Sequence, residues 1–495
     1  MYEALLKATQ EYQKIAASFA KPGPAALFGL PPAGRALLYA ALQKDLGRVL
    51  CIVTPGEAEA THFADDLKAL GLAAAVFPPR DFMLRPVEGA GREYEYRRLS
   101  VLGALAGGRL QAVCVPAEAL LQYTVPRDEF LKNTLTLKPG MVYNREALVA
   151  RLFAAGYVRR SQVDGPGQFS VRGDIVDIYA PDMRQPARVE YWDDEIDSIS
   201  TFDVGSQRRL EQCECLRCLP CMESIPALAK GGAAGLAKAV LALTSTRRKK
   251  QHADLQTNLE RDAERLRETG SLPAADKYMP LIYPEMATAF DYLPENAIVI
   301  IEDTPRLRDA VRDFHARVAD DVTALLERGE MPPALGEYAL DFVGVCGVKR
   351  QILRLDSFLN NVAELTPQHL ENFIANQMNA YGGNLDMASA DIRSYTEQGR
   401  AVAVVCGSAL RCQNMLDALT DTGLNVKISD LLPKGGCVNI MEGTLSAGFE
   451  YPDLGLVVMT EGQVLARRKK TQVKKSNRDK VKSYTDLTPG DLVVH

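Results

Sequence analysis

Histidine and tryptophan are scarce in this 495-residue sequence, which contains five His and one Trp. The five histidines stand singly, which disfavours a metal site or a catalytic triad built on His. Long apolar runs are also missing: AIVII at 297–301 has the length of a strand, whereas a membrane-spanning helix needs roughly 20 apolar residues. The N-terminal segment MYEALLKATQEYQKIAASFA lacks the unbroken apolar stretch of a secretion signal. We therefore expect a cytoplasmic protein without a membrane partner.

The sequence also has no large excess of charge of one sign. It contains 58 Lys and Arg against 63 Asp and Glu, a net charge of -5, so composition alone does not indicate a nucleic-acid binder. Hydrophobic residues make up 47%, which is typical of globular proteins. Single cores rarely exceed about 250 to 300 residues, so the length predicts about three to four domains. The ten cysteines are scattered, and we expect reduced thiols without disulfides.

Strand-like and helix-like patterns alternate along much of the chain. Their alternation over residues 24–120 predicts a parallel sheet covered by helices on both faces. Residues 168–210 are rich in β-branched and aromatic residues at period two, which predicts an antiparallel meander. Residues 213–346 are mostly helical in pattern, and residues 349–465 alternate again. The fold class is therefore multidomain α/β.

One loop has the spacing of a Walker A phosphate-binding loop, with the sequence GLPPAGRA from Gly29 to Ala36. In a working loop, a Lys after the second glycine reaches the phosphates and a Ser or Thr hydroxyl holds Mg²⁺. Here the second glycine, Gly34, is followed by Arg35 and Ala36, so the hydroxyl is missing. The prolines at 31 and 32 have no N–H to donate to phosphate. We predict that this loop does not bind ATP productively and that the chain needs no cofactor.

A second degenerate motif follows the apolar strand at 298–301, which ends in Glu302 and Asp303. Walker B strands end in such carboxylates, which position Mg²⁺ and water. Alone the pattern is weak, and a solvated strand end is the other interpretation. Together with the loop at Gly29, it predicts a nucleotide-binding scaffold that has lost its catalytic contacts.

The segments GQFSVRGDIVDIY at 167–179 and RVEYWDDEIDSI at 188–199 resemble the module shared by UvrB and the transcription-repair coupling factor Mfd. The resemblance covers essentially the whole chain, and it includes the degenerate loop, which is expected of the coupling factor but not of UvrB. The final TDLTPGDLVVH at 485–495 resembles the start of that family's RNA-polymerase-interacting domain.

This resemblance implies a domain order. We expect a degenerate helicase-like α/β domain in two parts, an inserted UvrA-binding domain, a further α/β domain, a basic linker with nine Lys or Arg, and the truncated start of the polymerase-interacting domain. The two parts of the helicase-like domain are expected at 1–126 and 211–348, and the inserted UvrA-binding domain at 127–210. The further α/β domain is expected at 349–465, the basic linker at 466–484 and the truncated start of the polymerase-interacting domain at 485–495.

The family's UvrA-contacting positions fall on Arg172, Arg188 and Trp192. Two arginines and one large aromatic residue are frequent in energetically dominant contacts. The alternative places Trp192 in the core and pairs both arginines with the acidic run at 193–195. Tyr191 and Trp192 are adjacent and point to opposite faces of a strand, so we expect one of them to be exposed.

The resemblance further implies a role in transcription-coupled nucleotide excision repair, as an adaptor that recruits UvrA to RNA polymerase stalled at DNA damage. The family's ATP- and Mg²⁺-dependent double-stranded-DNA translocase would lie beyond His495, as would most of the polymerase- and DNA-binding regions. We expect no ATPase activity from this chain, and a monomer. Two alternatives are a UvrB-type ATP-dependent helicase subunit and a nonspecific DNA-binding module acting through the basic run at 466–484.

Four cysteines, Cys213, Cys215, Cys218 and Cys221, lie within nine residues. Structural zinc sites usually take two ligands from each of two separated segments, so this spacing disfavours zinc and we expect burial instead. The neighbouring carboxylates at 193, 194, 195 and 197 could suggest a metal or an acid–base site, but we expect solvated turn charges.

Overall fold

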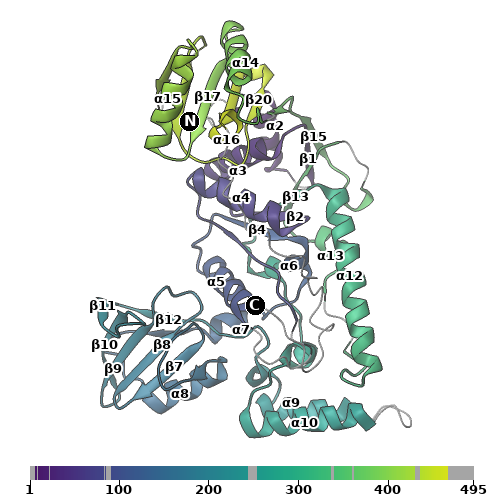
Figure 1. Cartoon of the computed structure of the whole chain (residues 1–495). Coiled ribbons are helices and arrows are strands. Elements are labelled where there is room, and N and C mark those ends of the chain that lie inside the picture. Colours follow the sequence, from purple (N-terminus) through teal and green to yellow (C-terminus); the bar gives the residue numbers. More distant parts are fainter. Residues whose placement is uncertain are drawn as a thin grey trace.

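The structure is a computed structural model with three regions: a central α/β body, an inserted lobe beside it, and a smaller α/β domain at the top of the view (Figure 1). It describes residues 6–7, 9–21, 23–82, 84, 91–243, 253–335, 339–358, 362–378, 380–429 and 435–465. The expected basic linker at 466–484 and the expected start of a further domain at 485–495 lie outside the described residues.

The central body is built on a seven-stranded sheet with the order β15-β1-β14-β13-β2-β4-β3, in which every neighbouring pair is parallel. Its strands are short apolar runs: β1 (Ala25–Phe28), β2 (Leu50–Thr54), β3 (Ala74–Val76), β4 (Ala112–Pro116), β13 (Ile298–Glu302), β14 (Gln351–Asp356) and β15 (His369–Asn372). Successive residues of β2 enter different cores, since Cys51 and Val53 face one and Leu50 and Ile52 the other. The prediction of a parallel sheet covered on both faces is confirmed.

Helices cover both faces of this sheet. On one face lie α2 (Gln10–Ser18), α3 (Pro32–Leu46) and α4 (Glu57–Ala69). The other face borders a second core, in which the helices α6 (Ala117–Leu121) and α12 (Thr304–Glu327) contact strands of the sheet. The same core includes α5 (Glu93–Ala106), α7 (Arg127–Lys132), α9 (Gly232–Ala242), α10 (Ala253–Thr269), α11 (Met279–Ile282) and α13 (Phe342–Cys346), and of these α9 and α10 pack against each other at the lower end of the body (Figure 1). Short 3₁₀ turns occur at Pro226–Leu228, Ala275–Tyr278, Ala289–Tyr292, Ala363–Leu365 and Pro452–Leu454.

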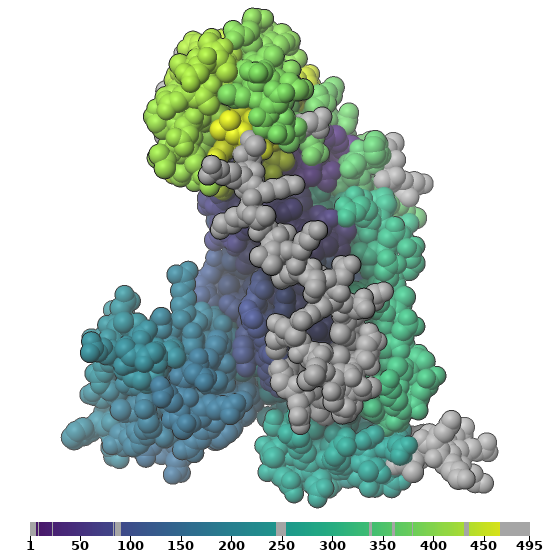
Figure 2. Space-filling view, in the orientation of Figure 1, coloured from purple at the N-terminus to yellow at the C-terminus, as the bar shows by residue number. Residues whose placement is uncertain are grey.

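The inserted lobe has its own core and projects from the side of the molecule (Figure 2). Its six-stranded sheet has the order β11-β10-β9-β8-β7-β6 and is antiparallel except for the β6–β7 pair. The strands are β6 (Val158–Arg159), β7 (Gln168–Arg172), β8 (Ile175–Tyr179), β9 (Ala187–Trp192), β10 (Glu195–Phe202) and β11 (Arg209–Gln212), and α8 (Arg145–Ala154) belongs to the same lobe. The predicted antiparallel meander is confirmed. The two ends of the lobe are joined by an antiparallel pair, β5 (Leu135–Leu137) with β12 (Leu216–Cys218).

The third region is a mixed six-stranded sheet with the order β16-β20-β21-β17-β19-β18. Its elements are β16 (Asn376–Gln377), α14 (Leu385–Glu397), β17 (Ala401–Cys406), α15 (Ala409–Asp421), β18 (Val426–Ile428), β19 (Val438–Glu442), β20 (Phe449–Tyr451), β21 (Leu456–Thr460) and α16 (Glu461–Val464). Val402 and Val404 of β17 face a core of this region alone, whereas Ala403 and Val405 join the core that contains α3. The third region therefore shares a core with the central body.

Three expected domain boundaries need correction. The boundary at 349 is wrong because β14 and β15 pair with β1 in the central sheet, so the third sheet begins only at β16. The boundary at 210 is wrong because β11 continues to Gln212 and β12 then returns to pair with β5. The start at 127 is too early, since Phe130 of α7 packs in the central core.

Candidate docking surface and the degenerate phosphate loop

The sheet of the inserted lobe has one covered face and one outer face. On β9, Ala187, Val189 and Tyr191 are buried in the core of the lobe, while the residues between them point the other way. Helix α8 covers the core face, where the rings of Phe153 and Phe169 lie 5.0 Å apart, edge to face. The outer face carries the three residues expected to contact a partner.

Trp192 lies on this outer face at the end of β9 with 80% of its surface exposed, whereas Tyr191 beside it is 6% exposed. The prediction that one of the two is exposed is confirmed, and the alternative that places Trp192 in the core is wrong. One exposed apolar residue is ordinary by itself, so what distinguishes Trp192 is that it shares the outer face with Arg172 and Arg188.

Arg172 and Arg188 converge on one carboxylate, Asp177 of β8. Arg172 Nη2 donates to Asp177 Oδ2 at 2.6 Å, and Arg188 binds both carboxylate oxygens, at 2.7 Å from Nε and 3.0 Å from Nη2. The pairing of the arginines with the acidic run at 193–195 is therefore wrong. Asp177 was not among the predicted site residues, although a lone acidic residue within the apolar strand IVDIY at 175–179 is a usable signal.

Arg188 is held from several sides. Its guanidinium carbon lies 4.5 Å from the centre of the buried Phe202 ring, and Nη2 reaches Gln207 Oε1 at 3.4 Å. The hydrogen bonds to Asp177 raise the pKa of Arg188. Arg188 is thus a fixed cation near the surface, and Arg172, with 46% of its side chain exposed, presents a second cation beside it.

In the central body, the predicted loop does connect a strand to a helix, because β1 ends at Phe28 and α3 begins at Pro32. The two glycines of this loop are crowded by the residue that follows β15 and by a residue of β20. A Cβ on Gly29 would lie 1.9 Å from the backbone oxygen of Phe373, and Gly29 has a φ of +84°. A Cβ on Gly34 would lie 2.8 Å from the hydroxyl of Tyr451 in β20. Protein atoms therefore lie directly against both glycines of the loop.

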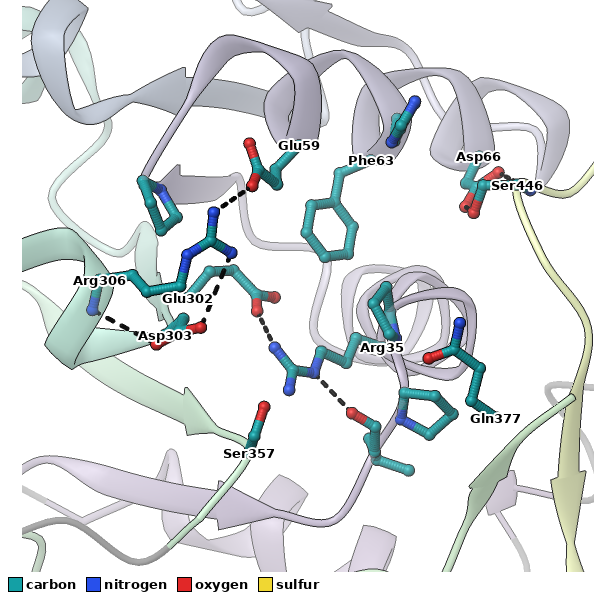
Figure 3. A pocket seen from close by; sticks show the side chains of 15 residues that line it. Arg35, Glu59, Phe63, Asp66, Glu302, Asp303, Arg306, Ser357, Gln377 and Ser446 are labelled. Atoms are coloured by element: carbon teal, nitrogen blue, oxygen red, sulfur yellow. Dashed lines mark hydrogen bonds and ion pairs between the residues drawn. The ribbon is translucent and has the colours of Figure 1, made fainter. Parts of the chain in front are cut away.

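Arg35 points back into the protein rather than toward a ligand. Its Nε donates to the Leu30 carbonyl at 2.7 Å, and its guanidinium forms a buried ion pair with Glu302 of β13 (Figure 3). The Tyr39 hydroxyl also donates to Glu302. Burial raises the pKa of Glu302 although Arg35 opposes this shift. The interpretation of Glu302 as a solvated strand end is wrong, since it is almost fully buried.

Asp303, the second carboxylate of this motif, caps α12 instead of facing a phosphate site. Its side chain accepts from the Arg306 backbone N–H at 3.4 Å, and its φ is +48°. Arg306 in turn binds Glu59 at 2.7 Å. Both carboxylates of the expected Walker B motif thus have protein partners.

A cavity of about 350 Å³ lies beside Arg35 at the carboxyl end of the parallel sheet (Figure 3). Its walls carry two arginines, four carboxylates and apolar side chains, among them Arg35, Arg306, Glu59, Asp66, Glu302 and Asp303. The excess of carboxylates opposes binding of a polyphosphate, and neither Arg35 nor Ala36 supplies the hydroxyl that would hold Mg²⁺. The residues present do not fit Mg²⁺-ATP.

The four clustered cysteines separate by burial. Cys218 and Cys221 are buried in the core of the lobe, and burial raises the pKa of both thiols. Cys213 is half-buried and Cys215 is exposed, so the expectation of burial holds for only part of the cluster. Within the described residues, no group of three or more His, Cys, Asp or Glu side chains is placed to hold a metal ion.

Comparison with known proteins agrees with this geometry. The sequence model of the UvrB interaction domain matches residues 135–223, which run from β5 to just beyond β12. A transcription-repair-coupling factor from Bacillus subtilis is 28% identical over 485 residues, covering 95% of this chain and 41% of that protein. Relatives with the same description from Staphylococcus epidermidis and Staphylococcus aureus are 26% and 24% identical, and each covers 94% of this chain.

The chain is homologous to the N-terminal region of transcription-repair-coupling factors. It spans about two fifths of the length of these curated relatives. The inserted lobe is the part that corresponds to the UvrB interaction domain. Across the described ranges, no helix is both long enough and apolar enough to span a bilayer.

Proposed function

We propose that this chain acts in transcription-coupled nucleotide excision repair, as the adaptor region that recruits UvrA to RNA polymerase stalled at DNA damage. One observation carries the proposal: the lobe that matches the UvrB interaction domain exposes Trp192 on the same face as Arg172 and Arg188. A rigid aromatic residue next to fixed cations is the composition of an energetically dominant contact.

The proposal assigns no ATP chemistry to these residues. Arg35 is paired with Glu302 inside the protein, and Phe373 and Tyr451 lie against the loop glycines, which argues against a UvrB-type ATP-dependent helicase. The same alternative needs room for a long hairpin, but only residues 77–92 lie between β3 and α5. We place the ATP- and Mg²⁺-dependent DNA translocase, and most contacts with RNA polymerase and double-stranded DNA, in the parts of the relatives that this chain does not cover.

The test is calorimetric titration of the 495-residue chain with purified UvrA. The parent chain should bind, and Trp192→Ala should weaken binding by about 2 kcal/mol or more, as expected for a dominant contact. Combining it with Arg172→Ala and Arg188→Ala should abolish measurable binding.

Leu210→Ala is the matched control, because Leu210 is also an exposed apolar residue of this sheet but lies on β11, away from Trp192. It should bind like the parent. Absence of binding by the folded parent chain would refute the adaptor role, whereas equal binding by the parent and the triple variant would move the contact to another surface.

A further inference from the structure

Val142 is an exposed apolar residue in a segment that extends the sheet of the lobe beyond β10. The backbone around it is held by hydrogen bonds from Gly140 N–H to the Ile196 carbonyl at 2.7 Å and from Ile196 N–H to the Met141 carbonyl at 2.9 Å. A third bond joins Tyr143 N–H to the Asp194 carbonyl at 2.8 Å. Val142 is therefore fixed in position, although 72% of its surface is exposed.

The register places Val142 in line with Trp192. Val142 pairs with Glu195, and Glu195 pairs with Trp192 on the other side. Side chains of directly paired residues point to the same face of a sheet, so the three form a row on the outer face. The next residue along, Tyr143, packs against the core of the lobe, as alternation requires if Val142 points outward.

Charge is distributed unevenly around this row. The turn between β9 and β10 carries exposed Asp193 and Asp194, and Glu195 stands between the two apolar side chains. Glu195 forms no ion pair with another described residue. Arg188 lies earlier on β9, the strand of Trp192 itself, and Arg172 lies on β7, on the side of β9 away from Val142. The outer face thus presents an apolar pair with an acidic side and a basic side.

We propose that Val142 is a second apolar anchor of the UvrA-docking surface and that Glu195, between it and Trp192, meets a basic residue of UvrA. This inference rests on the proposed function and extends it to Val142, which lies outside the two segments that suggested the docking site, and to Glu195, which had been expected to be a solvated turn charge. The proposal depends on the alignment of Val142 with Trp192. Single exposed apolar residues are ordinary, but these two lie in one row of the sheet with charged residues beside them, so they form one contiguous surface.

The experiment compares Val142→Asp with Val158→Asp in the full chain, by titration with UvrA. Val158 is 47% exposed and pairs with Gln168 on the same outer face, but it lies at the far edge of the sheet on β6. A carboxylate at an apolar anchor must be desolvated on docking, so Val142→Asp should weaken binding about tenfold or more while Val158→Asp stays within about twofold.

Glu195→Gln tests the charged part, with Asp197→Asn as its control because Asp197 is an exposed carboxylate of the same strand. Glu195→Gln should reduce affinity and flatten its dependence on salt, and Asp197→Asn should do neither. Circular dichroism and thermal melting establish that each variant is folded. If Val142→Asp melts early, Val142→Thr keeps the side-chain shape and should still lower the affinity.

The outcomes separate the two proposals. If the parent chain does not bind UvrA, the proposed function itself is wrong. If the parent binds and Trp192→Ala weakens it, but Val142→Asp and Val142→Thr match Val158→Asp, the docking role stands and the second anchor is wrong. If Glu195→Gln keeps the parent's affinity and salt dependence, the partner has no basic residue at that position.

Discussion

At the scale of single residues, the outer face of the lobe depends on one buried carboxylate. Asp177 is the common acceptor for Arg172 and Arg188 and is itself almost inaccessible to solvent. Burying a charge is costly unless it is paired, and removing one partner of a buried pair leaves that cost uncompensated. Asp177 therefore determines whether the two arginines stay in place.

We expect Asp177→Ala to lower the free energy of unfolding of the lobe by roughly 3–5 kcal/mol, because Arg188 loses both of its carboxylate bonds. Arg172→Ala is the matched comparison and should cost about 1 kcal/mol or less, since the Arg172 side chain is largely exposed. Pulse proteolysis in increasing urea, with fragments of the lobe followed by mass spectrometry, measures both. Equal resistance of the two variants would contradict the role given to Asp177.

At the scale of elements, the loop between β1 and α3 has obstacles to phosphate binding besides the residues at 35 and 36. Pro31 caps α3 and Pro32 is its first residue, and the two glycines are crowded by Phe373 and Tyr451. A Lys and a hydroxyl at positions 35 and 36 would leave both obstacles in place.

We therefore expect the double variant Arg35→Lys, Ala36→Thr to show no saturable binding of Mg²⁺-ATP in calorimetry. It should also be less stable than the parent, because a lysine ammonium cannot reproduce the guanidinium that binds both Glu302 and the Leu30 carbonyl. A control, Arg306→Lys, changes an exposed arginine of the same cavity and should leave stability nearly unchanged. Saturable ATP binding by the double variant would mean that the loop can open.

The local sequence pattern predicted where the strands and helices lie better than it predicted which strands pair with each other. The strands, the meander and the loop–helix junction follow from periodicity, which acts over a few residues. Periodicity cannot predict that β14 and β15 are the neighbours of β1, because both strands come more than 300 residues later in the sequence. The order of strands in a parallel sheet is set by packing and not by local sequence. The alternation at Tyr191 and Trp192 also follows from periodicity, whereas the partner of the two arginines depends on the register between β7, β8 and β9, which periodicity does not set.

At the scale of the whole molecule, the third region is joined firmly to the central body. Ser446 donates to Asp66 of α4 from both its backbone N–H, at 2.8 Å, and its hydroxyl, at 2.6 Å. Tyr451 is buried against α3, and strands β17, β20 and β21 contribute to the core that holds α3 and α4. The two regions should respond together when this contact is disturbed.

Tyr451→Ala should lower the free energy of unfolding by about 3–5 kcal/mol, as for other large aromatic residues removed from a core. It should also speed hydrogen exchange in α3, which Tyr451 contacts through Gly34. Tyr381→Ala is the control, because Tyr381 packs against the other core of the third region. If exchange in α3 is the same in both variants, the shared core does not couple the two regions.

The antiparallel pair of β5 and β12 has a consequence for how such molecules arise. Leu135 lies opposite Cys218, so the chain leaves the central body and returns to it at neighbouring points, about one strand spacing apart. A lobe with its own core and adjacent ends can be removed from a protein or inserted into one as a unit, because a short turn is enough to connect the two chain ends that remain. Exchange of the lobe as a unit would therefore change little in the scaffold on either side of the β5–β12 pair.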